Sequence, residues 1–373
     1  MAGRFSFLTK RFFLFLNILA AAVFLLVCYV PYLDPARWWF ISFLGFGFLF
    51  ILTIVLLFVF FWLLFRPRYV FISLVALLLG WRGITVFFAF NRADAFREEK
   101  PKDILRVAHW NVARFVELRR NNNKGSRTRL KMMELISRQN ADVLCLQEFY
   151  QSTDPGFYNN LSYVKNKLGY PYYYFSWDID GGTQWAGQVI FSKFPILNSG
   201  ITWFPKPGRP ESLIYADIRF RQDTVRFFTT HLQSVQFKKR DFETIQKIKN
   251  REDSILENSK NIFSKLRSAT TIRPEQARIV QTLVSQSPHP LVLTGDFNDV
   301  PNSYTYFTIR KGLNDAFLEK GFGIGRTYPF IAPTLRIDYI FSSKELAVQQ
   351  FKREMNDYSD HYMLVTDLRL PTN

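Results

Sequence analysis

The sequence predicts an α/β domain that follows an N-terminal region of three membrane-spanning helices. Two observations support this fold class. Long uncharged runs dominate residues 1–90, and the remainder alternates short β-branched or aromatic segments with amphipathic ones. With 373 residues, 48% of them apolar, the chain can bury a large core. Its two cysteines, Cys28 and Cys145, are too few for a disulfide framework.

Three segments of the first ninety residues are expected to cross a membrane. Residues 12–33 and 38–65 form apolar runs, the second without any charge. Each exceeds the roughly 20 residues that a helix needs to cross a bilayer. Residues 69–90 are a third candidate, although Arg82 interrupts them. A cleaved signal peptide fits the first run poorly, because the apolar part is too long and no small-residue cleavage site follows.

Basic residues in the short loops set the expected orientation. They gather before the first span and after the second, whereas the loop between these spans carries one arginine beside an aspartate. The positive-inside rule then places the N-terminus in the cytoplasm. Three crossings would leave the large domain outside the cytoplasm. If residues 69–90 do not span, the large domain lies in the cytoplasm instead.

Beyond residue 90 the composition is that of an ordinary soluble domain. Residues 91–103 are polar and charged, as expected of a linker, and residues 104–373 are expected to form the large domain. Residues 1–90 contain seven Lys and Arg and one Asp, so the rest has 41 basic and 30 acidic residues. This excess suits phosphate esters, nucleic acid or lipid headgroups, or simply a solvated basic surface. No feature indicates an obligate protein partner.

Strands and helices alternate along the large domain. Helices are predicted over 127–138 and over 274–285, the second with Pro274 in its first turn. Apolar residues spaced by three, four or seven within 236–268 predict one or two further amphipathic helices. Seven short segments are predicted to be strands, namely 104–110, 143–147, 188–191, 213–220, 225–230, 291–294 and 336–341.

Polar residues stand at the ends of these strands. A single Asp, Asn or His at a strand end is usually a turn residue or a helix cap. Several strands that each end in Asn, Glu, His or Asp are harder to attribute to turns, because the strands of one sheet end at a common edge. The sequence therefore predicts a converging site. Its candidate residues are Asn111, Glu148, His231, Asp296, Asn298, Asp338, Asp360 and His361.

The order of these motifs resembles that of the endonuclease/exonuclease/phosphatase superfamily, which includes deoxyribonuclease I, neutral sphingomyelinases and inositol polyphosphate 5-phosphatases. The resemblance covers about residues 104–370. It implies a four-layer α/β sandwich, two packed mixed sheets flanked by helices, that cleaves phosphate esters with a divalent metal. The matching segments are WNV (110–112), LQE (146–148), GQVIFSKFPI (187–196), THLQS (230–234), GDFND (295–299), RIDYIF (336–341) and SDH (359–361).

A further segment, GIGRTY at 323–328, resembles bacterial membrane-anchored members of the superfamily. It implies an integral protein of a bacterial plasma (inner) membrane. The resemblance also implies a metal site. Glu148 would be the principal ligand of Mg²⁺, or of Mn²⁺ in its place, with Asn111 in support and Asp360 as a ligand or an outer neighbour.

The resemblance further implies how the remaining residues act. Asp296 would orient or deprotonate the attacking water, and Asn298 would donate a hydrogen bond to the phosphate. His361 would contact the phosphate while Asp338 holds its other ring nitrogen, and His231 would act on the leaving side. Which histidine is the acid stays open.

Each residue also has a structural alternative. Asp338 could form a surface salt bridge with Arg336, and His231 could be a satisfied core histidine. Asp299, the last residue of GDFND, is expected only to shape its loop.

Two function classes remain open. The first is a membrane-tethered, metal-dependent phosphoesterase that acts on a phospholipid, a nucleic acid or another phosphate ester. The second is a non-catalytic, membrane-anchored module that binds anionic phosphate ligands on the same fold. The second is disfavoured because Glu148, Asp296 and His361 are all present. Abasic-site endonucleases of the superfamily typically have tyrosine where THLQS has His231, so repair of abasic DNA is a poor match.

Overall fold

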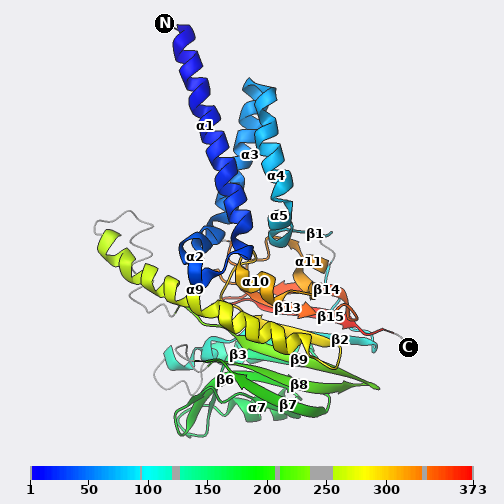
Figure 1. The fold of residues 1–373 in the computed structure, drawn as a ribbon. Coiled ribbons are helices and arrows are strands. Elements are labelled where there is room, and N and C mark those ends of the chain that lie inside the picture. Colours follow the sequence, from blue (N-terminus) through cyan, green and yellow to red (C-terminus); the bar gives the residue numbers. More distant parts are fainter. Residues whose placement is uncertain are drawn as a thin grey trace.

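The large domain consists of two β-sheets packed face to face between helices, with the N-terminal helices standing on one side (Figure 1). The structure is a computed structural model that describes residues 2–92, 95–119, 127–205, 211–235, 255–329 and 334–371. The layers are therefore helix, sheet, sheet and helix. This arrangement confirms the predicted α/β sandwich.

The first sheet has the strand order β14-β15-β2-β3-β6-β4, with β5 beside β6. β2 and β3 are parallel and the other pairs are antiparallel, so the sheet is mixed. The predicted strands at 104–110, 143–147 and 188–191 are confirmed. The strands are Ala347–Glu354 (β14), Met363–Arg369 (β15), Ile104–Asn111 (β2), Val143–Ser152 (β3), Gln184–Ser192 (β6), Tyr172–Phe175 (β4) and Ile179–Asp180 (β5).

The second sheet has the strand order β11-β13-β10-β9-β8-β7. It too is mixed, because β9 and β10 are parallel and the other pairs antiparallel. The four other predicted strands are confirmed, the last beginning two residues later than expected. The strands are Asn314–Asp315 (β11), Asp338–Ser342 (β13), Leu291–Asp296 (β10), Asp223–His231 (β9), Ser212–Phe220 (β8) and Ile196–Trp203 (β7). A separate two-stranded sheet pairs Ala89–Phe90 (β1) with Phe322–Gly323 (β12).

Alternation along each strand divides the core into layers. On β2, Leu105 and Val107 face the second sheet, whereas Ala108 and Trp110 face the helices on the outside. Those helices are Arg127–Gln139 (α6), which confirms the prediction over 127–138, and Asn160–Lys167 (α7). The outer face of the second sheet is covered by Ile255–Ser285 (α9) and Tyr304–Ile309 (α10), and Ala316–Lys320 (α11) packs at its edge.

α9 is much longer than predicted. It continues through Pro274, so the prediction of a helix beginning there was wrong. A proline inside a helix removes one hydrogen bond of the backbone ladder. The helix nevertheless continues, because Ala269 before the proline and Ala277 and Val280 after it are all buried. Of the amphipathic stretch predicted within 236–268, residues 255–268 belong to α9, and residues 236–254 lie outside the described residues.

The N-terminal region contains two helical segments long and apolar enough to cross a membrane, Phe7–Tyr32 and Pro35–Phe65. A third crossing exists if Pro67–Leu79 and Trp81–Phe87, which are bent by 62°, count as one span. Figure 1 shows α1, α3 and α4 side by side, with the N-terminus at the end far from the large domain. The helices are Ala2–Tyr29 (α1), Pro35–Ser42 (α2), Phe48–Phe65 (α3), Val70–Leu79 (α4) and Trp81–Phe87 (α5).

The uncharged run predicted to span at 38–65 contains a break. A 3₁₀ turn, Phe43–Gly47, separates α2 from α3, and α2 packs against α9 through Trp39 and Phe263, whose rings lie 5.3 Å apart. Arg82 lies exposed at the domain end of the helices, with its guanidinium 5.3 Å from the Phe307 ring of α10. Through this cation–π contact, the Arg82 side chain points toward the large domain.

The membrane helices share one apolar core with the second sheet. Phe24 of α1, Phe48 of α3 and Phe87 of α5 belong to the same buried cluster as Phe297 and Phe341 of the large domain. The rings of Phe48 and Phe87 stack with their centres 4.5 Å apart. Removal of residues 1–90 would expose part of this shared apolar core to water. The large domain is thus built on its membrane helices rather than joined to them by a free linker.

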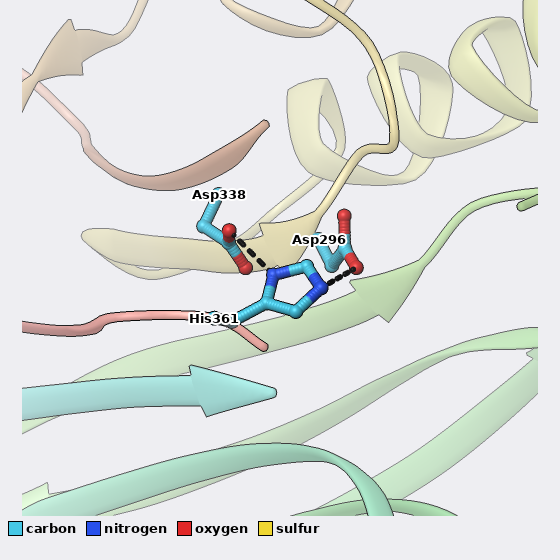
Figure 2. Close-up of side chains that lie close together, drawn as sticks. All are labelled: Asp296, Asp338 and His361. Atoms are coloured by element: carbon cyan, nitrogen blue, oxygen red, sulfur yellow. Dashed lines mark hydrogen bonds and ion pairs between the residues drawn. The ribbon is translucent and has the colours of Figure 1, made fainter. Parts of the chain in front are cut away.

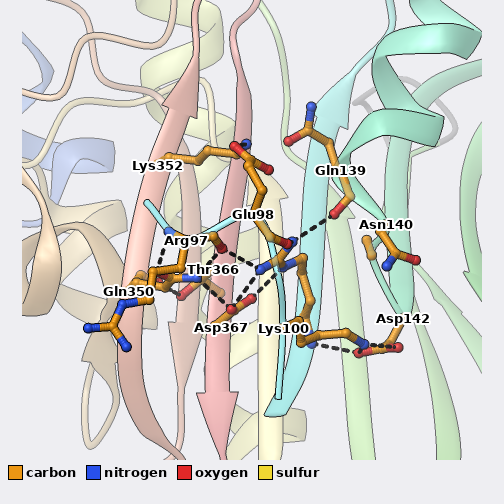
Figure 3. A network of polar contacts seen from close by, with 12 residues as sticks. Arg97, Glu98, Lys100, Gln139, Asn140, Asp142, Gln350, Lys352, Thr366 and Asp367 are labelled. Carbon is orange, nitrogen blue, oxygen red and sulfur yellow. Dashed lines mark hydrogen bonds and ion pairs between the residues drawn. The ribbon is translucent and has the colours of Figure 1, made fainter. Parts of the chain in front are cut away.

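The segment after the N-terminal helices is held on the large domain by a network of polar contacts, in which Figure 3 labels Arg97, Glu98 and Asp367. Arg106 of β2 is fully buried, and its Nε lies 2.7 Å from Oδ1 of Asp367 on β15. The same guanidinium donates to the carbonyls of Glu98 and Arg97. Residues 95–103, predicted as a linker, therefore follow a fixed path across the sheet.

Substitution of Asp367 by alanine should lower the free energy of unfolding by about 3–5 kcal/mol, because it leaves the Arg106 guanidinium buried without its carboxylate. Chemical denaturation of the full chain in detergent measures this loss. Glu134→Ala is the matched control. It removes an exposed ion pair with Arg138 on α6, which should cost less than about 1 kcal/mol. Equal losses in the two variants would contradict the role given to Arg106.

Candidate active site

Three adjacent strands of the second sheet bring His231, Asp296 and Asp338 to one place. Asp296 ends β10 and is the register partner of His231 on β9 and of Asp338 on β13. His231 Nε2 lies 3.6 Å from Asp296 Oδ2. Gly295 permits this close approach, because a Cβ there would lie 2.6 Å from the Thr230 carbonyl oxygen.

His361 lies between two of these carboxylates (Figure 2). Its Nδ1 is 2.8 Å from Asp338 Oδ2, and its Nε2 is 3.6 Å from Asp296 Oδ2. The other oxygen of Asp338 lies 3.2 Å from His109 Nε2. Asp338 therefore fixes the ring of His361 and leaves its second nitrogen directed at Asp296.

The surface alternative for Asp338 does not hold. Asp338 is buried, and its backbone amide donates to Thr327 Oγ1. Arg336 is buried as well and pairs with Asp315, with Nη1 and Oδ2 2.7 Å apart. Although Arg336 and Asp338 are only two residues apart, their side chains therefore belong to separate hydrogen-bond networks.

Electrostatics favour positively charged imidazoles at this site. Burial disfavours the charged forms of Asp338 and His361, but their attraction outweighs it, lowering the pKa of Asp338 and raising the pKa of His361 well above its ordinary value. Burial likewise opposes charge on His231, but Glu211 and Asp296 outweigh it and raise its pKa. Burial raises the pKa of Asp296 itself, although the charge of His361 counteracts part of this effect.

Two residues of the first sheet complete the site from the opposite side. Asn111 ends β2, and its Nδ2 lies 3.1 Å from Asp296 Oδ2. Glu148 lies at a bulge of β3 with a φ of +48°, which turns its side chain out of the regular alternation. The surrounding protein opposes ionisation of Glu148, but the positive charges of His231 and Arg114 outweigh this effect and lower its pKa.

The two other predicted residues lie nearby in different settings. Asn298 has a φ of +53°, and its Nδ2 donates to the Leu232 carbonyl at 3.0 Å, which ties the GDFND loop to the end of β9. Its backbone amide donates to Asp296 Oδ1. Asp360 is half-buried, with Oδ1 3.3 Å from Ser359 Oγ. The hydrogen bond expected from Asn298 to the phosphate and the contact of Asp360 with a metal stay predictions.

A cleft with an empty volume of about 480 Å³ opens beside Glu148 and His231. Its lining also includes Asp178 and Glu211, which sequence reasoning missed. Neither residue stands at the end of a predicted strand, so no local pattern marks them. In the structure, a Cβ at Gly187 of GQVIF would lie 2.4 Å from Ser176 Oγ and 3.0 Å from Asp178 Oδ2, so only glycine leaves room there for this segment.

The donors of the site fit a divalent metal on its Glu148 side. Mg²⁺ prefers one or two carboxylates together with water. Glu148 has a lowered pKa, to which neighbouring Asn111 contributes, and keeps 37% of its side chain exposed. Among the described residues, Asp296, Asp338 and His361 also offer ligand atoms within 4.8 Å of one another. His361 Nδ1 and Asp338 Oδ2 are hydrogen-bonded to each other, so a metal that took those two atoms would have to displace this bond.

Known protein families match both parts of the chain. A model described as the endonuclease/exonuclease/phosphatase family matches residues 108–361, and a model of a domain of unknown function matches residues 10–87. No curated protein matches the chain.

Two solved structures resemble the fold. An endonuclease/exonuclease/phosphatase from Beutenbergia cavernae DSM 12333 is 21% identical, with 72% of each chain covered and a TM-score of 0.50. The human Nocturnin catalytic domain with bound sulfate anion is 20% identical, with 72% of this chain and 94% of that chain covered and a TM-score of 0.51. These similarities support the sandwich fold.

In metal-free protein, His361 should titrate well above pH 6.5, the ordinary value for histidine. Because folding raises the pKa of His361, its pairing with Asp338 stabilises the fold fully below pH 6.5. This stabilisation is lost as pH rises through the pKa of His361 in the folded state. NMR of the full chain with labelled histidine can follow the titration of His361, since the chain has only four histidines. Asp338→Asn should lower the midpoint. A midpoint at or below 6.5, or one unmoved by Asp338→Asn, would contradict this electrostatic account.

Proposed function

Because the chain belongs to the endonuclease/exonuclease/phosphatase family, we propose that it hydrolyses a phosphoric ester with the help of a divalent metal. The observation that carries the proposal is the convergence of Asp296 with His231 and His361, each imidazole 3.6 Å from the same carboxylate oxygen. Ester hydrolysis needs a proton acceptor beside an in-line water and positive charge around the phosphoryl group. This cluster supplies both.

The residues divide the work as follows. Asp296, between the imidazoles, orients the attacking water and accepts its proton. His361, kept protonated by Asp338, donates from Nε2 to a phosphoryl oxygen. His231, at the edge of the cleft, protonates or polarises the leaving oxygen. The raised pKa values of both histidines support these donor roles.

Glu148, Asn111 and Asp360 would hold the metal, Mg²⁺ or alternatively Mn²⁺. When bound, the metal supplies positive charge that neutralises the phosphoryl oxygens. Asn298 would add a hydrogen bond to the phosphate from its second amide hydrogen, since Leu232 engages only one of them.

We further propose that the enzyme is tethered in a bacterial plasma membrane, with its N-terminus in the cytoplasm and its large domain outside. The apolar core shared with the membrane helices supports tethering. The substrate is a phospholipid, a nucleic acid or a smaller phosphate ester, and proximity to the bilayer favours the lipid. Besides bilayer and substrate, the proposal needs no protein partner.

Asp296→Ala and His361→Ala should each lower hydrolysis by at least about 100-fold, the typical worth of a positioned acid or base. The assay uses the full chain in nanodiscs with Mg²⁺, against plasmid DNA, RNA, sphingomyelin and phosphoinositides. Chelation of the metal should abolish activity in the wild type, and Glu134→Ala should leave it intact.

Retained activity in both folded site variants would sink the assignment. Phosphate-ester binding by a wild type that hydrolyses none of the four substrates would point instead to the non-catalytic module.

A further inference from the structure

The loop that follows Asp296 reaches the end of the first membrane helix. Asn302, six residues later, is fully buried, and its Nδ2 donates to the Val27 carbonyl oxygen at 2.8 Å. Val27 lies in the last turn of α1. Backbone carbonyls in the last turn have no amide donor within the helix. A side chain of the catalytic loop thus caps a membrane helix.

The backbone of Asn302 is held from a second side. Its carbonyl oxygen lies 2.9 Å from the place that a Cβ on Gly45 would occupy. Gly45 belongs to the 3₁₀ turn that precedes α3, and only glycine permits so close an approach. The loop is therefore seated between the end of one membrane helix and the beginning of the next.

The strand that carries Asp338 makes a contact of the same kind. Arg336, two residues earlier, donates from Nη2 to the Val86 carbonyl at 2.6 Å. Val86 lies in the last turn of α5, where a guanidinium also meets the negative end of the helix dipole. The two carboxylates that flank His361 thus each lie within a few residues of a membrane-helix cap.

The chain between Asp296 and Asn302 has little room to absorb movement. Phe297 is fully buried and stacks on Tyr339, with ring centres 4.9 Å apart. The Tyr339 hydroxyl donates to the Asp299 carbonyl at 2.8 Å, and the Asp299 side chain accepts from the next backbone amide. Because close-packed cores transmit displacement, a shift at Asn302 reaches Asp296.

We propose that Asn302 is a positioning residue that couples turnover to the way α1 lies in the bilayer. The inference rests on the proposed function, since it concerns the placement of the carboxylate that accepts a proton. Loss of the hydrogen bond should lower kcat about tenfold and leave KM unchanged, because small misplacement of a catalytic group costs up to about 100-fold in rate. Asn302 itself touches neither water nor phosphate in this scheme.

The test uses Asn302→Leu, which keeps the branched shape and the number of side-chain heavy atoms without the donor, and Asn302→Ala. Asn91→Ala is the matched control. Asn91 lies just after the N-terminal helices and ties the chain to the large domain, donating to the carbonyls of Leu318 and Gly321 at 2.8 and 3.0 Å. These acceptors belong to α11 and the residue after it rather than to a strand of the site. Each full chain is placed in nanodiscs with Mg²⁺ and assayed on bis(p-nitrophenyl) phosphate, in short-chain and long-chain lipids.

Wild type and Asn91→Ala should show equal kcat, and this kcat should change with lipid length. Both Asn302 variants should be slower and insensitive to lipid length. A purely structural role would lower thermal stability without removing that sensitivity.

Hydrogen exchange supplies a readout that does not depend on activity. Amides of residues 297–303 should exchange faster in Asn302→Leu than in wild type, while those of β3 should not change. A folded Asn302→Leu protein with wild-type kcat, or with wild-type exchange in this loop, overturns the proposal. If the wild type hydrolyses no ester, the proposed function fails, and the exchange of residues 297–303 alone decides whether α1 holds the loop.

Discussion

The register of three adjacent strands is the constraint on which the candidate site depends. Asp296 pairs with His231 on one side and with Asp338 on the other. A slip of one residue at either pairing would turn a functional side chain to the opposite face of the sheet. His361 then needs only the short segment before β15 to reach the two carboxylates. The charge arrangement follows from this register: two buried carboxylates with an imidazole between them.

The second sheet is packed on both faces, and this links the site to the N-terminal helices. Along β13, Ile340 faces the first sheet, whereas Tyr339 and Phe341 belong to the core shared with the membrane helices. Asp338, at the head of the same strand, fixes His361. Within four residues, the strand therefore carries the carboxylate that holds His361, one residue of the core between the sheets and two residues of the core shared with the N-terminal helices. The N-terminal helices and the candidate site thus belong to one packed body rather than to parts joined by a flexible tether.

Local patterns were enough to predict seven strands and the polar residues near their ends, because strand periodicity is visible in short segments. The strands β4, β7, β14 and β15 were not predicted. The pairing of His361 with Asp338 was implied by resemblance and appears in the geometry. Contacts between distant segments could not be predicted in this way. Arg336 pairs with Asp315 and Val86, not with Asp338, and Glu211 reaches the cleft only through strand pairing. The helix start predicted at Pro274 was wrong, because burial of one face of α9 stabilises the helix more than the loss of one backbone hydrogen bond destabilises it.

The most direct measurement is the position of the metal in the site. Crystals of the full chain grown with Mn²⁺ would locate the ion by its anomalous scattering. A single site bonded to the Glu148 carboxylate, with the hydrogen bond between Asp338 and His361 intact, is the result expected of a metal-assisted phosphoesterase with this division of roles. A metal bound among Asp296, Asp338 and His361, with that hydrogen bond broken, would contradict it.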